Sequence, residues 1–300
     1  MPRMKFTCMF VLWSALWLMA CGDGPSTKTA KKNNDGPPAK KASPVEESHV
    51  VVWAEWLKTG ADGRAFLNDT NATFTGRVMD YYELEGGEGV IQTHFKNGLR
   101  HGPSTWWHWN GKLAGTVTYV NGKEQGIKTW WYENGRKMRE LTHEKGQREG
   151  AANGWHETGK REFIAHWKND KPMGDFTEWF PSGKVMTTRA YADGLREGME
   201  THWYEVGQKA WEMNWRAGKR QGTRTEWYTN GKNASQIIYQ AGQRHGLSNS
   251  WYQNGEKSSE ITHDTGKETR HLEWDESGAP IDLTEDGWNP DGTPRAKSRD

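Results

Sequence analysis

Histidine and carboxylate side chains have the widest chemical repertoire in this chain, because they bind metals and transfer protons. A metal site needs three or four ligands that converge. The eleven histidines instead occupy unrelated positions, among them His101, His108, His143, His156, His245 and His263. The carboxylates sit at expected turns and strand faces, and the sequence has no GxSxG, HExxH, P-loop or dinucleotide motif. We therefore predict no metal, no cofactor and no enzymatic activity.

A second set of candidate residues is aromatic, and each member directly follows a regularly spaced tryptophan. The set comprises Tyr132, Phe180, Tyr204, Tyr228 and Tyr252, with His108 and His156 at the same spacing. Aromatic rings on an otherwise polar face stack on sugar rings or hold an extended partner strand. The other interpretation is that these rings only cover backbone and neighbouring side chains, and we prefer it. The first five residues remain the candidate binding surface.

These aromatic residues recur because the chain repeats itself every 24 residues. Three series keep this spacing without a gap: Gly102 to Gly246, Trp107 to Trp251, and Gly111 to Gly255. A fourth series, from Gly98 to Gly266, is broken only at Asp170. An internal period of this length indicates a repeat architecture, in which each unit packs mainly against its neighbours.

Each repeat has the residue pattern of a β-hairpin. An Asn-Gly pair such as Asn134-Gly135 follows the tryptophan, and this pair suits the positive φ angles of a type I′ turn. The next stretch, for example "RKMRELTH", has the length of one strand and ends at another glycine turn. Side-chain alternation suggests that Trp131 and Leu141 lie on an aromatic and aliphatic face, while Glu140 lies on a polar face.

The sequence therefore predicts an all-β fold, an elongated single-layer antiparallel meander of 24-residue β-hairpin repeats over residues 49–282. Two strands per repeat at about 4.8 Å each put equivalent side chains about 10 Å apart. The alternative is a β-propeller with two repeats in each four-stranded blade. The low hydrophobic content of 33% argues against the propeller, because its blades pack face to face.

The N-terminus has the pattern of an export signal. Arg3 and Lys5 precede the apolar stretch "FTCMFVLWSALWLMA", which is too short for an ordinary transmembrane helix. The letters "LMAC" that end at Cys21 resemble the lipobox of bacterial lipoproteins. This resemblance implies cleavage after Ala20 (a signal peptide over 1–20), a diacylglyceryl group on Cys21, and lipid anchoring of an exported protein to the bacterial cell envelope, at the outer membrane or cell surface.

Both ends of the mature chain are predicted to be flexible. Residues 21–48 are rich in Lys, Pro, Ser, Asn and Gly and contain too few apolar residues to fold, so we predict a disordered tether. Residues 283–300 have the composition of a flexible tail. Cys8 lies within the predicted signal peptide, so the mature protein would have no internal disulfide, no cysteine-based zinc site and no cysteine nucleophile.

The repeats resemble the bacterial variant of the MORN (membrane occupation and recognition nexus) repeat. "WYENGRK" and "YVNGKEQG" match its pattern almost letter for letter, and the resemblance extends from about Val50 to Ile281. Glu83 in place of the first Trp, Asp170 in place of a turn glycine and Arg270 in place of the last one depart from it. The family is associated with scaffolding and membrane-proximal assembly, and many bacterial members carry an antitoxin label.

Three functions follow as hypotheses. The first is a non-catalytic, lipid-anchored repeat protein with an extended surface for protein–protein interaction, whose partners are the membrane through Cys21 and an unidentified envelope protein. The second is a module that binds cell-wall glycan through the aromatic row. The third is an antitoxin-like or immunity protein of an exported toxin. A formal net charge of +1, with no concentrated basic stretch, argues against a nucleic-acid partner.

Overall fold

The computed structural model describes residues 50–70, 72–84, 87–284 and 286–295. The predicted signal peptide (1–20), Cys21 and the predicted tether (21–48) lie outside the described residues. The described chain forms two units, one of residues 50–99 and 104–112 and one of residues 100–103 and 113–295. None of the helices in the described part is long and apolar enough to cross a membrane.

The first unit combines short strands with one long hairpin. Its elements are β1 (Val51–Trp53), the 3-10 helix η1 (Ala54–Trp56), β2 (Leu57–Thr59), β3 (Ala65–Leu67), β4 (Gly76–Leu84), β5 (Gly87–Lys96) and most of β6 (Leu99–Trp107). β1 runs parallel to β4, and β2 pairs with β3 in a small separate sheet. A compact core of Val52, Ala65, Phe74 and Val78 holds these strands together.

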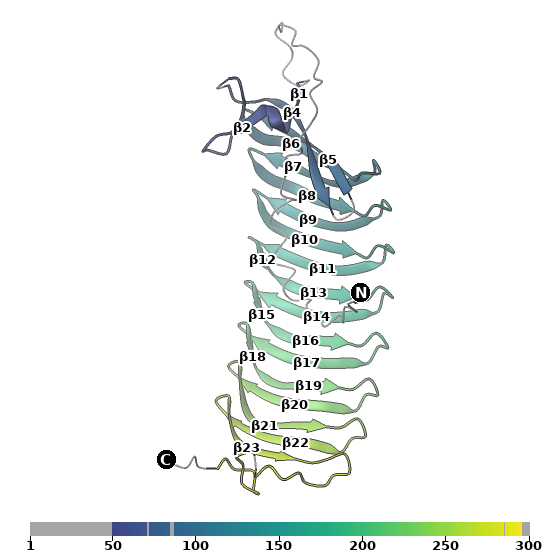
Figure 1. The fold of residues 1–300 in the computed structure, drawn as a ribbon, viewed down its shortest axis with the longest axis vertical. Coiled ribbons are helices and arrows are strands. Elements are labelled where there is room, and N and C mark those ends of the chain that lie inside the picture. The colour runs from purple at the N-terminus through teal and green to yellow at the C-terminus, as the bar shows by residue number, and fades with distance from the viewer. Residues whose placement is uncertain (1–49, 71, 85–86, 285, 296–300) are drawn as a thin grey trace, which may run out of the picture. The chain divides into compact units, whose positions relative to one another are not determined.

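The second unit is the predicted meander, in which each strand pairs with the next along the chain (Figure 1). Its strands are β7 (Leu113–Val120), β8 (Lys123–Trp131), β9 (Lys137–Glu144), β10 (Gln147–Trp155), β11 (Arg161–Lys168), β12 (Lys171–Pro172), β13 (Gly174–Trp179), β14 (Val185–Ala192), β15 (Leu195–Arg196), β16 (Gly198–Trp203), β17 (Lys209–Arg216), β18 (Lys219–Arg220), β19 (Gly222–Trp227), β20 (Asn233–Gln240), β21 (Gln243–Trp251), β22 (Lys257–Asp264) and β23 (Lys267–Glu273). The unit is a single open layer, which confirms the predicted fold class for these repeats and excludes the propeller.

Two kinds of turn alternate along the second unit, and the prediction about them was wrong. The type I′ pattern, with positive φ at both residues, occurs in two-residue turns such as Asn121-Gly122 (φ 50° and 82°). After the tryptophan the chain forms a five-residue loop instead, in which only the glycine has positive φ, as at Gly135. In this loop the Tyr132 N–H donates to the Arg136 carbonyl at 2.9 Å, and the Gly135 N–H donates to the Tyr132 carbonyl at 2.8 Å.

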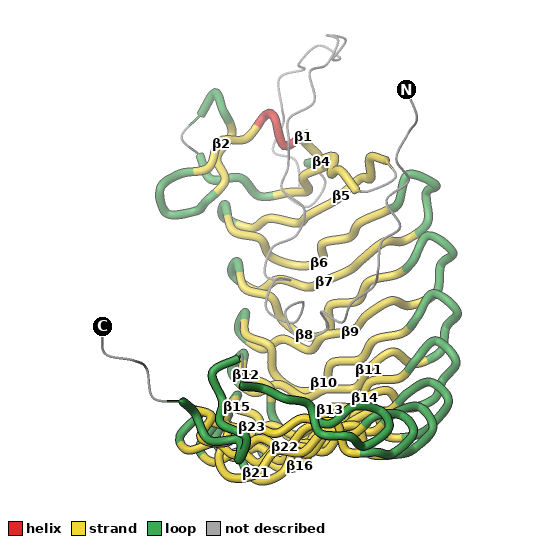
Figure 2. Tube along the Cα trace, turned by 60° about the horizontal axis from the view of Figure 1, so that its bottom comes forward, coloured by secondary structure: helices red, strands yellow, loops and turns green. Residues whose placement is uncertain are grey.

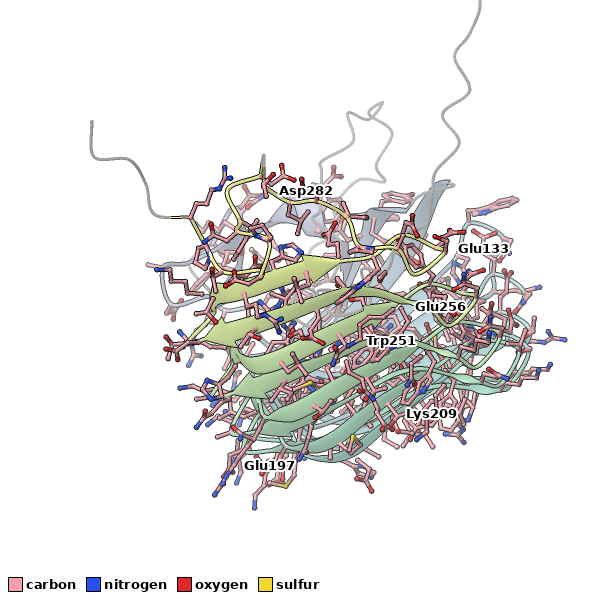
Figure 3. The ribbon with its side chains drawn as sticks, turned by 90° about the horizontal axis from the view of Figure 1, so that it is seen from below. Glu133, Glu197, Lys209, Trp251, Glu256 and Asp282 are labelled. Carbon is pink, nitrogen blue, oxygen red and sulfur yellow. The ribbon has the colours of Figure 1, made fainter. Side chains whose placement is uncertain are left out.

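The two turn types separate the two long edges of the second unit. The five-residue loops follow one edge and the two-residue turns the other, as the green segments in Figure 2 show. In Figure 3, Glu133 and Glu256 lie on the loop edge and Glu197 lies on the turn edge. Side chains that project from either edge are therefore far from those of the other edge within this unit.

The predicted distribution of side chains between the two faces was also wrong. Lys128 pairs with Leu141, whereas Thr129 pairs with Glu140, and directly paired residues project to the same face. An extra residue, Met138, forms a β-bulge beside Trp131, so the register differs from simple hairpin counting. The Trp131 series therefore lies on one face, which we call the tryptophan face. Leu141, His143 and their equivalents lie on the other, which we call the arginine face.

Neighbouring repeats are joined by side-chain bonds to backbone at both edges. At the loop edge, Asn134 accepts a bond from the Arg136 N–H (2.8 Å), and its amide donates to the Glu157 carbonyl (3.1 Å). Asn230 and Asn254 repeat this arrangement. At the turn edge, acceptors on Gln125, Glu149, Glu197 and Gln221 receive a backbone N–H from the next repeat's turn. In these five-residue loops the Asn of Asn-Gly thus connects repeats, and its φ is not positive.

The last strand of the second unit is covered by the chain that follows it. The His271 N–H donates to the Gly292 carbonyl at 2.8 Å, and the Ile281 N–H donates to the Glu273 carbonyl at 2.9 Å. The Trp288 ring packs edge-on against His271 at 5.4 Å. The sequence predicted a flexible tail from residue 283, but residues 286–295 instead contact β23. An uncovered strand edge would expose unpaired backbone groups to other chains.

Candidate interaction surface

The predicted aromatic row lies at the loop edge, where each member is the first residue of a five-residue loop. Backbone bonds from this residue close the loop in each case, for example from Tyr204 to Gln208 and from Gly207 to Tyr204, both at 2.8 Å. The loop starts here because strands such as β16 end at the tryptophan, where a bulge interrupts the pairing. All five predicted residues, Tyr132, Phe180, Tyr204, Tyr228 and Tyr252, occupy this position and are half-buried.

The tyrosine hydroxyls of this row connect each repeat to the next. Each hydroxyl donates to the backbone carbonyl of the tryptophan one repeat further on. The bonds are Tyr132 to Trp155 (2.8 Å), Tyr204 to Trp227 (2.9 Å), Tyr228 to Trp251 (2.6 Å) and Tyr252 to Trp274 (2.9 Å). His156 places Nε2 at 2.8 Å from the Trp179 carbonyl in the same way. The row's tyrosines and His156 therefore have a clear structural role, which Phe180 cannot share because it has no hydroxyl.

The tryptophan face carries a repeated group of a lysine, a glutamate and a ring. Lys209 Nζ lies 2.7 Å from Glu212 and 5.7 Å from the centre of the Trp227 ring. The same group recurs at Lys257, Glu260 and Trp274 with nearly the same distances. Because the lysine stems lie over the rings, the tryptophans are only half-exposed.

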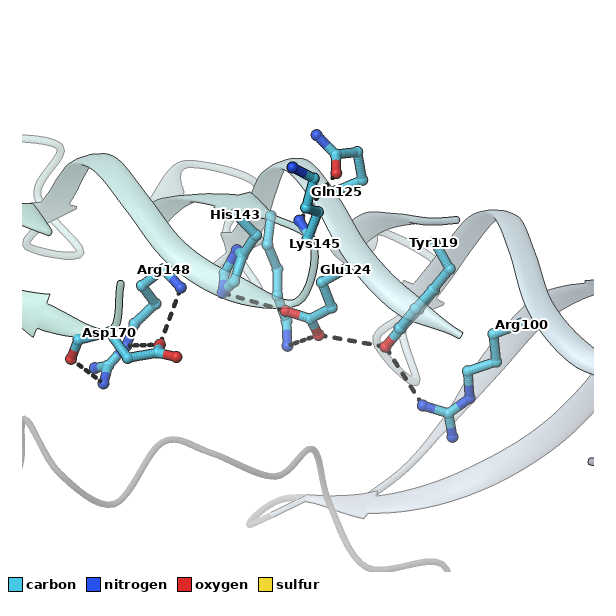
Figure 4. A network of polar contacts seen from close by, with 9 residues as sticks. Arg100, Tyr119, Glu124, Gln125, His143, Lys145, Arg148 and Asp170 are labelled. Atoms are coloured by element: carbon cyan, nitrogen blue, oxygen red, sulfur yellow. Dashed lines mark hydrogen bonds and ion pairs between the residues drawn. The ribbon is translucent and has the colours of Figure 1, made fainter. Parts of the chain in front are cut away.

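The arginine face carries aromatic residues that alternate with charged ones near the turn edge. In Figure 4, Arg100 lies beside the Tyr119 hydroxyl at 3.4 Å, and that hydroxyl lies 3.3 Å from Glu124. Glu124 also contacts Lys128 Nζ at 2.8 Å and His143 Nε2 at 3.2 Å. The single-layer sheet thus buries several charged groups among its own side chains on this face.

Arg148 and Asp170 form a separate pair on this side of the sheet, and they explain the one two-residue turn without glycine in the described part of the second unit. The Arg148 guanidinium lies 3.8 Å from the centre of the Trp167 ring, a cation–π contact. Asp170 accepts bonds from the Arg148 backbone N–H at 2.9 Å and from Nε at 3.0 Å (Figure 4). Burial opposes ionisation of this carboxyl, but the bonds from Arg148 outweigh it and lower the pKa of Asp170.

A second charge cluster lies in the middle of the arginine face. The Arg189 side chain is 2% exposed and lies between Glu178 (3.4 Å) and Glu200 (3.8 Å). Glu200 also accepts bonds from Arg196 at 3.0 Å and His202 at 3.1 Å. Burial favours the neutral acid, but these bonds leave the pKa of Glu200 below its usual value. Glu178 has fewer cationic partners, and burial raises its pKa.

Neither cluster has the arrangement of a metal site. Within the described residues no group of three His, Cys, Asp or Glu side chains could hold a metal ion. Each clustered carboxylate forms an ion pair with a cation of the same face, so these groups contribute to the stability of the sheet. Perturbed pKa values of this kind also arise in structural ion-pair networks.

Sequence reasoning missed the arginines that share one repeat position on this face. Arg148, Arg196, Arg220 and Arg244 share one repeat position. The 24-residue spacing could have revealed them, but a repeat position that also holds Glu124, Pro172 and Glu268 looks unremarkable beside the invariant glycines. To recognise these arginines as a group, one must first know which residues lie on each face of the sheet. That assignment depends on the bulge beside the tryptophan.

Comparison with known proteins agrees with the repeat assignment. The MORN repeat variant matches residues 100–121, which supports a MORN-repeat protein and, more broadly, a repeat protein used for protein or membrane interaction. No curated protein sequence matches the chain. Among solved structures, "Crystal Structure of TcdB2-TccC3" is similar over 72% of this chain and 16% of that chain, at 14% identity and a TM-score of 0.14. The chain thus spans a small part of that structure, and a TM-score this low does not indicate a shared fold.

Proposed function

We propose that this protein is a non-catalytic, lipid-anchored repeat protein that presents an extended surface for protein–protein interaction in the cell envelope. The main support is the way in which neighbouring repeats are joined. Loop residues such as Tyr228 and Asn230 bond to the backbone of the next repeat, so the surface of the second unit is held in a fixed arrangement. A preorganised surface loses less conformational entropy on binding than a flexible one.

The anchoring part of the proposal rests on the N-terminal sequence alone. A basic start, an apolar stretch and a small residue before Cys21 fit a lipidated export signal. A lipid chain contributes about 0.8 kcal/mol per buried CH₂, so two acyl chains on Cys21 would hold the protein at a membrane. The second unit would then face whatever proteins share that membrane.

Replacement of Cys21 by Ser tests the anchoring. We expect the unchanged full chain to sediment with membranes and to incorporate labelled fatty acid when it is expressed in a bacterium that processes lipoproteins. The Cys21→Ser variant should incorporate none and should be released from membranes by high salt. A variant that stays in the membrane fraction to the same extent as the unchanged chain would contradict the proposal.

Site-directed photo-crosslinking in cells tests the interaction. A crosslinking residue replaces Met199, which is 52% exposed on the tryptophan face, or Arg244, which is exposed on the arginine face. A scaffold or adaptor should yield a discrete product from one face and much less from the other. Equal, diffuse labelling at both positions, or none at all, would count against a specific protein partner.

A further inference from the structure

Three arginines of the arginine face form a regular row in consecutive repeats, and we call Arg196, Arg220 and Arg244 the arginine row. Each pairs across its own hairpin with an aromatic residue, as Arg220 does with Trp215. Arg196 also lies 4.7 Å from the centre of the Trp215 ring, and Arg220 lies 5.2 Å from that of Tyr239. Rings and guanidinium groups therefore alternate along the stack of strands.

The charge of this row is only partly compensated. Arg196 is bonded to Glu200, but the next two repeats have Arg224 and Ser248 at the position of that glutamate. Arg220 and Arg244 are both exposed, and no carboxylate of the described chain lies within ion-pair distance of either. Earlier in the unit, by contrast, Arg148 is paired with Asp170.

Aromatic rings fix the direction of two of these guanidinium groups, those of Arg196 and Arg220. A guanidinium that stacks on an aromatic ring keeps its N–H edge free for hydrogen bonds in the plane, and this edge matches a carboxylate bidentately. The indole N–H of Trp215 lies in the same row and is buried without a hydrogen-bond partner in the described chain. Two acceptors already bond to the row, Glu200 to Arg196 at 3.0 Å and the Tyr239 hydroxyl to Arg220 at 3.4 Å, and the other donors of Arg220 and Arg244 outnumber the acceptors beside them.

The spacing of the row indicates how a partner would lie. Equivalent residues of neighbouring repeats are two strands apart, about 10 Å. A segment in the polyproline II conformation makes one turn in three residues and rises about 3.1 Å per residue, so every third side chain points the same way and these side chains lie about 9 Å apart. We propose that Arg196, Arg220 and Arg244 bind an extended acidic segment of a partner protein that crosses the strands, with a carboxylate at every third position. This proposal rests on the proposed function and names the chemistry of the partner.

A peptide series tests the proposal on the full chain purified in detergent. The first peptide has glutamate at every third position, separated by serine and threonine. The second has the same composition with all glutamates adjacent, and the third has glutamine in place of glutamate. Fluorescence anisotropy should give the tightest binding for the first peptide, at least threefold weaker binding for the second and none for the third. Added salt should weaken binding because exposed charges are screened.

Matched variants locate the binding. Arg220→Glu with Arg244→Glu should weaken binding of the first peptide at least tenfold. The control, Lys168→Glu with Arg216→Glu, makes the same charge change at exposed positions of the same edge on the opposite face, and it should change binding less than threefold. Near-ultraviolet circular dichroism of the tryptophans checks that both variants are folded. Arg220→Lys with Arg244→Lys retains the charge but loses the paired N–H donors of the planar guanidinium, so it should give intermediate binding.

Several results would overturn the proposal. These are equal binding of the spaced and clustered peptides, equal loss in the two charge-reversed variants, or binding of an anionic polysaccharide such as polygalacturonate in preference to every peptide. With the crosslinking residue in place of Arg244, a protein partner that is still captured after Arg220→Glu would overturn the arginine row while the proposed function stands. If neither face yields a crosslinked product in the otherwise unchanged chain, the proposed function itself would be contradicted.

Discussion

At the scale of single residues, the tyrosine that follows each tryptophan acts chiefly as a connector. Its ring is half-buried, and its hydroxyl donates to a backbone carbonyl of the next repeat, as from Tyr228 to Trp251. A buried acceptor without a partner costs about 1–3 kcal/mol. This accounts for the preference for tyrosine, or for histidine at His156, without any ligand.

Removal of the Tyr228 hydroxyl should destabilise the protein measurably. We expect Tyr228→Phe to lower the free energy of unfolding by about 1 kcal/mol, because the hydrogen bond is lost while the ring remains. Tyr228→Ala should cost about 3 kcal/mol or more, because it also leaves a cavity. Urea denaturation followed by tryptophan fluorescence measures both. If Tyr228→Phe matches the unchanged chain, the hydroxyl has no structural role and a ligand-binding role for the row regains support.

Two buried histidines should make stability depend on pH. Burial lowers the pKa of His143 in spite of the nearby Glu124, and burial together with Arg244 lowers the pKa of His263. The unfolded chain then takes up protons that the folded chain does not, so stability is lost as the pH falls below about 6.5. The urea midpoint should therefore decrease between about pH 7.5 and 5.5.

The variant His143→Tyr with His263→Tyr provides the control for this pH effect. Other repeats have tyrosine at this position, for example Tyr119 and Tyr239, so the substitution suits the fold. The double variant should lose much of the decrease in urea midpoint over the same pH range. An unchanged slope would assign the effect to other groups.

At the scale of elements, the two-residue turn sets a requirement that Asp170 meets in an unusual way. Both Asn169 and Asp170 have positive φ, at 49° and 64°, where other turns place a glycine second. A non-glycine residue in this region costs about 1–2 kcal/mol. The bonds from Arg148 to the Asp170 carboxylate offset that cost.

Substitutions at Asp170 should separate these two contributions. Asp170→Ala keeps the strained backbone and loses the bonds, so we expect a loss of about 1–2 kcal/mol in the free energy of unfolding. Asp170→Gly loses the same bonds but relieves the strain, so it should be more stable than the alanine variant by about 1 kcal/mol. Thermal or urea unfolding of the two variants side by side gives the comparison. If the alanine variant is as stable as the glycine variant, the positive φ at position 170 does not strain the backbone.

The period of the sequence predicted the number and order of elements, because Gly and Trp recur at fixed positions and each repeat has room for two strands. It did not predict which turn is type I′. Asn-Gly is the strongest signal for that turn, yet Asn134 takes part in a longer loop and connects two repeats. The prediction of which side chains share a face was wrong because the bulge at Met138 shifts the strand register by one residue. A shift of one residue moves each side chain of the strand to the opposite face.

At the scale of the second unit, the chain after β23 protects the end of the stack. Residues 286–295 supply the Gly292 carbonyl and the Trp288 ring to His271. Deletion of residues 282–300 should expose the β23 edge and cause concentration-dependent association. Light scattering over a range of protein concentrations would detect it. A truncated chain that stays monomeric throughout would indicate that the edge protects itself.

The stacking of strands in chain order has a mechanical consequence for the second unit. Its strands lie across the direction in which the repeats follow one another, so tension between its ends would peel one strand from the next instead of shearing many at once. Each repeat that detaches would change from about 10 Å of stacked sheet to a 24-residue extended chain of about 80 Å. A protein held at one end and gripped at the other could thus lengthen stepwise by about 70 Å per repeat while the remaining repeats stayed folded.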